Sequence, residues 1–435
     1  MGLKQKAIKL FNNNDYKEIL TKGFSFFVLR VGGLLAGYVF TYFIAKEFGA
    51  SEVGLVSLCF TLIMCISIFG RLGIDVNLIP YFTHETNRQD SGLFFKVLIK
   101  AILLSSFLAL VIFLLKEVIS INLFKKPQLE AYMIWTALTI PLWTIILVCA
   151  GLFRALKKNT LFAFFNNPGR FLATLIVLLV LFICCKDDLL LAIKAHFYGV
   201  LIIAIISIYL ALKQFEKISV LSNSNSWLFL KEAYPMMLSG AIIVFLGWVD
   251  TFVLGIYETD ETIGVYNVAL KIATLTSFSL QAINSILAPK IAKYYKEGKH
   301  REFRKIIKFA TNINFLITLI IIVLIIVLHK TLLGMFGQEF LSGSLVLLIL
   351  CLGQLINSLS GSVGVIMQMT GLQKVYQNIV LVALIINIIL NFILTPRYGA
   401  VGAALATVIS MAFWNIYGAV YLKRKLHLVS YFRVV

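Results

Sequence analysis

Long apolar segments follow one another along almost the whole chain, and short polar breaks separate them. Each segment is roughly 20 residues long, the length that a helix needs to cross the hydrocarbon core of a bilayer. The pattern predicts about twelve membrane-spanning helices. They are expected at 22–46, 53–77, 94–115, 129–151, 161–184, 190–212, 233–257, 263–288, 306–330, 342–369, 375–396 and 400–422.

The composition agrees with this pattern and excludes a water-soluble helical protein. Of the 435 residues, 60% are hydrophobic and 14% are charged, whereas a soluble domain carries about 25% charged residues. A soluble bundle would have too little polar surface to face water. The chain is therefore predicted to be an all-α integral membrane protein, and none of the breaks between spans is long enough for a soluble catalytic domain.

Basic residues predict how the chain is oriented. Most of the 39 Lys and Arg residues fall at the N-terminus, in the even-numbered connections and at the C-terminus. Positive charge marks the cytoplasmic side of a membrane protein, so both termini are expected in the cytoplasm. The net charge of +19 follows from this bias. It indicates anionic lipid headgroups as the counter-surface, and no nucleic acid.

A polar linker near the middle of the chain divides the spans into two sets of six. The stretch "SVLSNSNSW" (219–227) has the Ser/Asn composition of a linker. It predicts an N-terminal six-helix lobe at 1–218 and a C-terminal six-helix lobe at 219–435.

Weak internal similarity relates the two predicted lobes. Gly54 and Gly264 occupy corresponding places between the first two spans of each half, and Pro80 and Pro289 end the second span of each half. An even number of spans separates the matching positions. The predicted repeat is therefore parallel, with a pseudo-twofold axis along the membrane normal.

Small residues open the last span, and their spacing predicts close helix packing. They recur every four positions at Gly402, Ala406 and Ser410. Helices in lipid associate by close packing and by hydrogen bonds between polar side chains. Asn387 and Asn391 in the preceding span also lie four apart, so they share a helix face and are expected to form hydrogen bonds across an interface.

Four stretches in a characteristic order carry a resemblance to a known family. They are "LRVGGLLAGYVFTYFIAKEFGASEVG" (29–54), "WVDTFVLGIYETDETIGVYNVALKI" (248–272), "ILAPKIAKYYKEGK" (286–299) and "TGLQKVYQNIVLVALIINIILNFILTPRYGAVGAALATVIS" (370–410). Together they resemble polysaccharide flippases, the O-antigen translocase branch of the multidrug/oligosaccharidyl-lipid/polysaccharide exporter superfamily.

The resemblance implies a function that composition does not reveal. Such a flippase moves an undecaprenyl-pyrophosphate-linked oligosaccharide, an O-antigen or other surface polysaccharide repeat unit, from the cytoplasmic to the periplasmic leaflet. It works by alternating access of a central cavity between two lobes. The implied location is the bacterial inner (plasma) membrane, within lipopolysaccharide or other polysaccharide biosynthesis. The implied partners are the lipid-linked glycan, membrane lipids and other polysaccharide assembly proteins. No cofactor and no enzymatic activity are implied.

Charged residues inside predicted spans are candidate binding residues, because an ionisable group at mid-bilayer costs on the order of 3 kcal/mol. Arg30, Arg71 and Arg170 lie within spans of the N-terminal half. Arg30 lies about 12 Å deep at the helical rise. Guanidinium groups match pyrophosphate oxygens in pairs, so these three residues are predicted to bind substrate. Asp75 completes the set. Two alternatives stay open: Arg71 and Asp75, four apart, neutralise each other, or Arg170 snorkels to the headgroup level.

Two charged residues in the C-terminal half are candidates for coupling or gating. Asp250 and Lys271 lie at similar predicted depths on consecutive spans. One interpretation is a structural ion pair. The other is a coupling site in which Asp250 binds a proton or a sodium ion and releases Lys271. His196 is interpreted as a buried hydrogen-bonding residue, with a proton relay as the alternative.

Two other functions are alternatives to the flippase. A cation-coupled multidrug antiporter of the same superfamily would need acidic residues in its cavity, and the N-terminal half offers mainly cations. A membrane glycan polymerase or ligase would carry a long outer loop with catalytic Arg or His residues, whereas the outer connections are short. No catalytic residue and no metal site are predicted.

Overall fold

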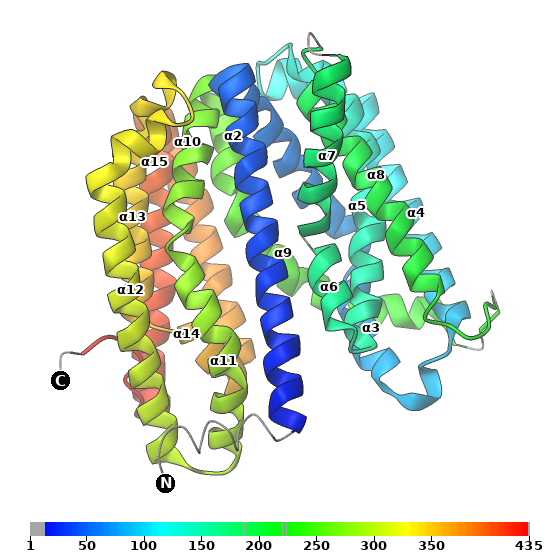
Figure 1. Cartoon of the computed structure of the whole chain (residues 1–435), viewed down its shortest axis with the longest axis vertical. Helices are drawn as coiled ribbons and strands as arrows, with labels where there is room; N and C mark the ends of the chain where they lie inside the picture. Colours follow the sequence, from blue (N-terminus) through cyan, green and yellow to red (C-terminus); the bar gives the residue numbers. More distant parts are fainter. Residues whose placement is uncertain (1–13, 167, 186–187, 220, 223, 434–435) are drawn as a thin grey trace. The chain divides into compact units, whose positions relative to one another are not determined.

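A computed structural model describes residues 14–433, apart from 167, 186–187, 220 and 223, and side chains from Leu29 onward, apart from that of Arg30. Every regular element within these residues is a helix (Figure 1). The elements are α2 (Asn14–Arg71), α3 (Ile74–Thr83), η1 (Glu85–Asn87), α4 (Ser91–Leu114), η2 (Val118–Leu123), α5 (Leu129–Ala155), α6 (Asn159–Asn166), α7 (Pro168–Cys184), α8 (Leu191–Leu212), α9 (Ser226–Tyr257), α10 (Asp260–Thr274), α11 (Ser277–Lys296), α12 (His300–Gly334), η3 (Gln338–Gly343), α13 (Ser344–Ser360), α14 (Val363–Met369) and α15 (Gln373–Leu426).

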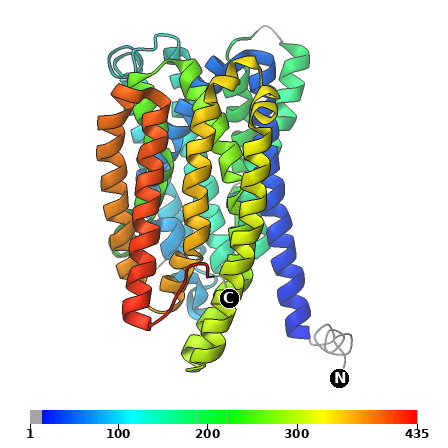
Figure 2. The ribbon, with the colours of Figure 1, turned by 90° about the vertical axis from the view of Figure 1, so that its left-hand side faces the viewer.

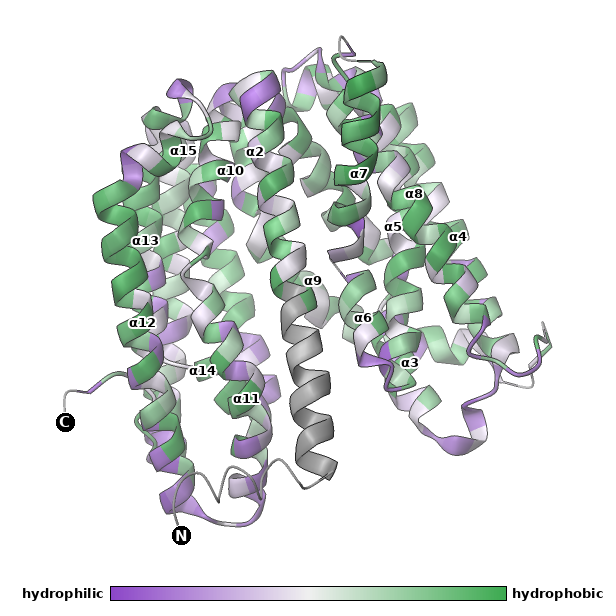
Figure 3. Ribbon diagram, in the orientation of Figure 1, coloured by the Kyte–Doolittle hydropathy of each residue, from purple (hydrophilic) through white to green (hydrophobic). Residues whose placement is uncertain are grey.

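The helices are long and apolar enough to cross a bilayer, which confirms a multi-pass membrane protein. Within the described residues, 8 helices qualify, or 10 when the bent pairs α6–α7 and α10–α11 each count as one span. Hydrophobic residues cover much of the long helices, and many hydrophilic residues lie at helix ends and in loops (Figure 3). All the apolar segments predicted from the sequence fall on these helices.

Two glycines interrupt the longest helices. The backbone of α2 leaves helical geometry at Gly49 (φ 83°), and that of α15 leaves it at Gly399 (φ 57°). Both values lie in the left-handed region, which glycine adopts without steric cost. Pro396 stands just before the second break. The turn predicted between spans 375–396 and 400–422 is confirmed, and the two arms of α15 lie side by side (Figure 2).

The described chain divides into two compact units. Unit 1 holds the described residues of 14–40, 62–119 and 127–240, and unit 2 holds those of 41–61, 120–126 and 241–433. In unit 1, α5 packs against α3, α4, α6 and α8, and α7 packs against α8. In unit 2, α13 packs against α10, α12 and α15, while α11 packs against α12 and α14. The sequence-based lobes 1–218 and 219–435 are a different division and stay a prediction.

A linker clamp fastens the chain between α8 and α9 to the first turns of α4, all within unit 1. Asp90 is the N-cap of α4, where it accepts a hydrogen bond from Leu93 N at 2.9 Å. Its Oδ2 also accepts bonds from the hydroxyls of Ser222, at 2.8 Å, and Ser224, at 3.0 Å. Lys96 donates to the Ser222 carbonyl at 2.8 Å. The linker predicted from its Ser/Asn composition is therefore held at Ser222 and Ser224.

Candidate functional site

Asp250, on α9, lies at the centre of a buried group of polar side chains in unit 2. Its Oδ2 accepts hydrogen bonds from the Tyr266 hydroxyl, at 2.7 Å, and from the Thr407 hydroxyl. Its Oδ1 accepts bonds from the amides of Asn391, at 2.8 Å, and Asn387, at 3.4 Å. These five residues form the Asp250 cluster. The Asp250 side chain is 5% exposed, and both asparagines and Tyr266 are 0% exposed.

The small residues of the last span bring the two arms of α15 together around Asp250. A Cβ on Gly402 would overlap the Leu394 carbonyl of the opposite arm, so glycine is needed for this approach. Asn387 donates to the Ser410 hydroxyl across the interface at 3.3 Å. The predicted packing face and the hydrogen bonding of Asn387 across it are therefore confirmed.

The Asp250 cluster suits a single positive charge. A buried carboxylate is costly unless hydrogen bonds or an opposite charge compensate it, and four side-chain donors reach this one. The Oδ1 atom of Asn387 has no hydrogen-bond partner within the described residues, so the cluster also offers an unused oxygen acceptor. One carboxylate surrounded by hydroxyl and amide groups can hold either a proton or a monovalent cation.

The hydrogen bond of Lys271, on α10, goes to a residue other than Asp250 and so does not support an ion pair between the two. Its Nζ donates to the Thr41 hydroxyl of α2, also within unit 2. Tyr266 and Lys271 are five residues apart, which places their side chains about 140° apart around the helix. Because Tyr266 points to Asp250, Lys271 points elsewhere. The four described partners of Asp250 do not include Lys271.

Arg71 and Asp75 form an ion pair across the break between α2 and α3. The Arg71 Nη1 and Asp75 Oδ2 atoms lie 2.7 Å apart, and the side chains are 12% and 20% exposed. Leu72 (φ 49°) and Gly73 (φ 77°) turn the chain between the two helices. A Cβ on Gly73 would overlap the Ala233 carbonyl. The mutual neutralisation left open by the sequence is seen, and a substrate role for the pair stays a prediction.

Arg170 lies in the first turn of α7, inside unit 1. Its side chain is 6% exposed, so it does not snorkel along the surface as one alternative held. Its guanidinium carbon lies 4.7 Å from the centre of the Trp143 ring and 4.4 Å from that of Phe171, the range of cation–π contacts. His196, on α8, is also fully buried, at 0% exposed. Arg30 belongs to α2, but its side chain lies outside the described residues.

Two helices of unit 2 cross at a reciprocal pair of glycines, the glycine crossing of Gly54 and Gly264. A Cβ on either glycine would lie 3.1 Å from the backbone nitrogen of the other. It would also overlap a carbonyl one turn earlier on the opposite helix: that of Asp260 for Gly54, and that of Ala50 for Gly264. Only glycine at both positions allows helices to pack this closely.

Polar contacts surround the glycine crossing. Lys126 and Asp260 form an ion pair with 3.2 Å between Nζ and Oδ1, and each side chain is 8% exposed. Lys126 also donates to the Glu258 carbonyl. Glu339 accepts a hydrogen bond from the Ala50 amide, directly after the break at Gly49. Unit 2 thus joins segments 41–61 and 120–126 to the second half of the chain.

Sequence reasoning missed several members of these sites. Tyr266 and Thr407 are uncharged, so the search for charged residues inside predicted spans did not select them. Their signal was only that each lies in a stretch that carries the family resemblance. The partnership of Lys126 with Asp260 joins residues far apart in the chain, and their positions near the ends of predicted spans made both look like ordinary interfacial charges.

The family model described as "Polysaccharide biosynthesis protein" matches residues 19–295. The chain belongs to this polysaccharide biosynthesis protein family. A second model, MatE, matches residues 235–393, a range that includes four of the five members of the Asp250 cluster. The family resemblance predicted from the four stretches is therefore confirmed.

Relatives of this family member include probable flippases and a capsular polysaccharide biosynthesis protein. It is 27% identical over 179 residues to the probable low-salt glycan biosynthesis flippase Agl15 of Haloferax volcanii, covering 41% of this chain and 38% of the relative. It is 29% identical over 205 residues to the capsular polysaccharide biosynthesis protein CapF of Staphylococcus aureus, covering 46% and 51%. The matches thus span about half or less of these relatives' length.

Two solved structures of transporters share this fold. The lipid II flippase MurJ, in an inward closed conformation, superposes with a TM-score of 0.75 at 19% identity, covering 93% of this chain and 87% of that chain. An inward-facing multidrug resistance MATE family transporter of the MOP superfamily gives a TM-score of 0.67 at 15% identity, covering 93% and 94%. At these identities the likeness shows the fold of this polysaccharide biosynthesis family member.

Proposed function

We propose that this protein is a flippase that moves an undecaprenyl-pyrophosphate-linked oligosaccharide from the cytoplasmic to the outer leaflet of the inner membrane. The observation that carries the proposal is the match of the polysaccharide biosynthesis family model to residues 19–295. Relatives named as flippases and the fold of a lipid II flippase support it. The cargo is an O-antigen or another surface polysaccharide repeat unit, and polysaccharide assembly proteins act before and after it.

The proposed architecture has twelve spans in two lobes related by a parallel repeat, with both termini cytoplasmic. Counting α2 and α15 as two spans each, at Gly49 and Gly399, raises the number of candidate spans from ten to twelve. The glycine crossing supports the repeat. Gly54 and Gly264 were paired as equivalent positions from sequence, and a reciprocal contact is what equivalent residues make on a twofold axis.

The substrate site is proposed to use the cations of the N-terminal half. The Arg170 guanidinium lies against the Trp143 and Phe171 rings, and these contacts would orient its planar group toward a pyrophosphate. Arg30 is assigned to the same role from its depth in the first span. Arg71 is held by Asp75, so its part in binding would require that ion pair to exchange partners.

Coupling is proposed at the Asp250 cluster. A proton or a sodium ion at Asp250 would neutralise the carboxylate and change how strongly Tyr266, Thr407 and the two asparagines are held. Those donors come from both arms of α15 and from α10. Binding would therefore change the packing of three spans at once. Lys271, on α10, would respond through its contact with Thr41.

In an alternating-access cycle, the glycine crossing would act as a gate. The crossing and the Lys126–Asp260 pair join segments from both halves of the sequence, so these contacts would separate when a path opens between those segments. Close backbone packing without large side chains can separate and re-form with little rearrangement, which suits a gate.

Deletion of the gene, followed by localisation of its lipid-linked glycan, tests the function. Glycan accumulating in the cytoplasmic leaflet supports the flippase, whereas loss of glycan synthesis would instead support a polymerase or ligase. Complementation with Arg30→Ala and Arg30→Lys tests the site. Full activity of Arg30→Ala would show that Arg30 is not part of the substrate site.

A cation-coupled multidrug antiporter is the second candidate, because the MatE model matches residues 235–393. It predicts that deletion raises sensitivity to cationic drugs and leaves the glycan in its usual leaflet. Measuring both properties in the same deletion strain separates the two functions.

A further inference from the structure

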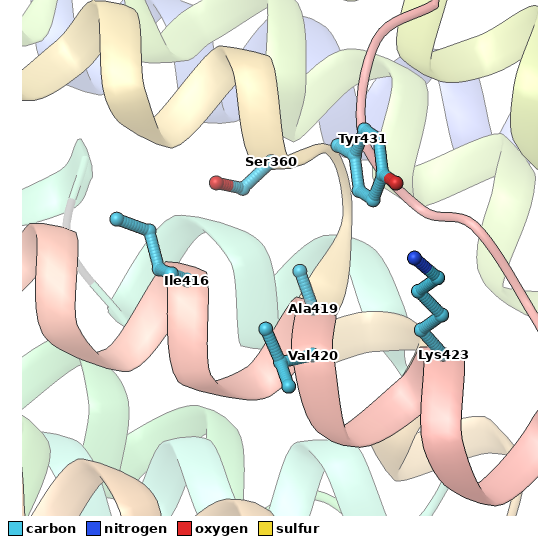
Figure 4. A pocket seen from close by; sticks show the side chains of 6 residues that line it. All are labelled: Ser360, Ile416, Ala419, Val420, Lys423 and Tyr431. Atoms are coloured by element: carbon cyan, nitrogen blue, oxygen red, sulfur yellow. The ribbon is translucent and has the colours of Figure 1, made fainter.

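A small cavity lies at the end of α15, where the helix meets the C-terminal tail (Figure 4). The residues that line it, which define the α15 slot, are Ser360, Ile416, Ala419, Val420, Lys423 and Tyr431. Its volume is about 280 Å³. Pockets for drug-sized ligands measure about 300–1,000 Å³, so the slot has room for part of a lipid and not for an oligosaccharide.

An ordered tail forms one wall of the slot. The Phe432 amide donates to the Leu359 carbonyl at 2.8 Å, and the Thr311 hydroxyl donates to the Ser430 carbonyl at 2.9 Å. The Phe432 ring packs on Phe315 with 4.2 Å between ring centres. These contacts hold Tyr431 beside α15, so the slot is a built feature of unit 2.

The floor of the slot is apolar and faces outward. Ile416 is 54% exposed and Val420 is 42% exposed. Both lie on a helix that is apolar enough to cross a membrane. Exposed aliphatic side chains on such a helix are in contact with acyl chains in a bilayer. The slot therefore begins among lipid tails.

The mouth of the slot is positively charged. Figure 4 shows Lys423 extending from α15 toward Tyr431. Arg433 donates to the Tyr431 hydroxyl at 3.3 Å. That hydrogen bond lowers the pKa of Tyr431, and the charges of Lys423 and Arg433 act in the same direction. Arg424 and Lys425 follow directly on α15, and within the described residues none of these four cations is in an ion pair with an acidic side chain.

We propose that the α15 slot binds one anionic phospholipid, with its phosphate between Lys423, Arg433 and the Tyr431 hydroxyl and an acyl chain along Ile416 and Val420. Cations beside an apolar surface at a membrane boundary match a molecule with a phosphate at one end and a hydrocarbon chain at the other. Ammonium and guanidinium groups form strong charge-assisted hydrogen bonds with phosphate oxygens. The site differs from both the substrate site and the Asp250 cluster, so it is independent of the proposed function.

Native mass spectrometry of the purified full-length protein, titrated with phosphatidylglycerol or phosphatidylcholine of the same acyl chains, tests the proposal. Phosphatidylglycerol should bind more tightly. Lys423→Gln and Arg433→Gln should each weaken its binding about fivefold, as expected for one basic residue at a lipid surface. Val420→Trp, which fills the apolar floor and keeps every charge, should weaken binding of the same lipid at least as much.

Arg301→Gln is the matched control, because Arg301 is an exposed cation of unit 2 on α12, outside the slot. Its removal should leave phosphatidylglycerol binding unchanged. An equal loss in this variant would show a diffuse electrostatic effect and overturn the proposal. So would unchanged binding in Val420→Trp. Competition by free glycerol phosphate as effective as that by lipid would show a soluble-phosphate site instead. Circular dichroism confirms that each variant keeps its helix content.

Discussion

Gly54 and Gly264 lie 210 positions apart in the chain, and each lies against the backbone of the other's helix. The contact is reciprocal, since a Cβ on either would overlap the carbonyl four residues before its partner. Sequence comparison paired the same two glycines as equivalents between the halves. Their meeting is the contact expected if the proposed twofold axis of the duplication passes through this crossing.

The first prediction concerns that crossing. Gly54→Ala and Gly264→Ala should each force the two helices apart, because the added methyl groups overlap backbone that cannot rotate away. Overpacking of this kind costs about 1–3 kcal/mol, and thermal unfolding midpoints in detergent should fall. Gly32→Ala is the control on the same helix, since a Cβ there meets nothing within 4 Å. Equal midpoints for Gly32→Ala and Gly54→Ala would contradict the close approach.

A second prediction separates charge from hydrogen bonding at Asp250. Asp250→Asn keeps the size of the side chain and removes its charge, so the protein should fold but lose ion-coupled transport. Asp250→Ala leaves four buried donors without their acceptor, at about 1–3 kcal/mol for each unsatisfied group, and should be markedly less stable. Transport in proteoliposomes under imposed proton and sodium gradients measures coupling. Gradient-dependent transport by Asp250→Asn would rule out a coupling role.

The third prediction concerns the Lys126–Asp260 ion pair. Removing one partner leaves a buried charge uncompensated, so Lys126→Met should destabilise the protein by about 3–5 kcal/mol. Adding Asp260→Asn should restore part of this loss. A double-mutant cycle of unfolding free energies measures the coupling. The more exposed Lys116–Glu130 pair, at 33% and 37% exposed, serves as the comparison, with about 0–1 kcal/mol expected. A coupling for the buried pair no larger than this would count against its role in holding unit 2 together.

A fourth prediction uses the linker clamp at Asp90. Burial raises the pKa of this carboxyl, but hydrogen bonds from Leu93 N, Tyr81, Ser222 and Ser224 outweigh burial and lower the pKa below its ordinary value. The ionised form therefore stabilises the clamp above about pH 4, near the unfolded-state pKa, and this contribution disappears as the pH falls through the lowered pKa. The protection factors of the described linker amides, which correct for the intrinsic pH dependence of hydrogen exchange, should fall over that acid range.

Asp90→Asn supplies the control for this measurement. Asparagine keeps the N-cap of α4 and cannot ionise. Exchange in the linker should then be faster at neutral pH and independent of the acid transition. An unaltered acid transition in the variant would show that another group controls the clamp.

The sequence located the helices well because the bilayer fixes their length and polarity. Every predicted apolar segment falls on a helix, and the turn at Pro396 and Gly399 was identified from residue chemistry alone. Asn387 and Asn391 were placed on one face by their spacing. Local periodicity determines such features, so they can be read without knowledge of the packing.

Features that depend on tertiary packing were not accessible in the same way. Similar depth suggested that Asp250 and Lys271 could pair, but depth does not specify the direction in which a side chain points around its helix. Thr407 and Tyr266 became partners of Asp250 only when both arms of α15 and α10 met. The burial of Arg170 likewise depends on Trp143 of another helix, and no local sequence pattern predicts that contact.

The linker clamp has a consequence for how the polypeptide can be divided. Because Ser222 and Ser224 are fastened to Asp90, and Lys96 holds the same stretch, a chain break just after them would leave the new end anchored. The first turns of α9 also belong to unit 1. They have a separate contact there, because the Asn77 amide donates to the Phe229 carbonyl at 3.0 Å. Two separately expressed fragments, divided at this junction and held together there by non-covalent contacts, should therefore reassociate into a functional protein.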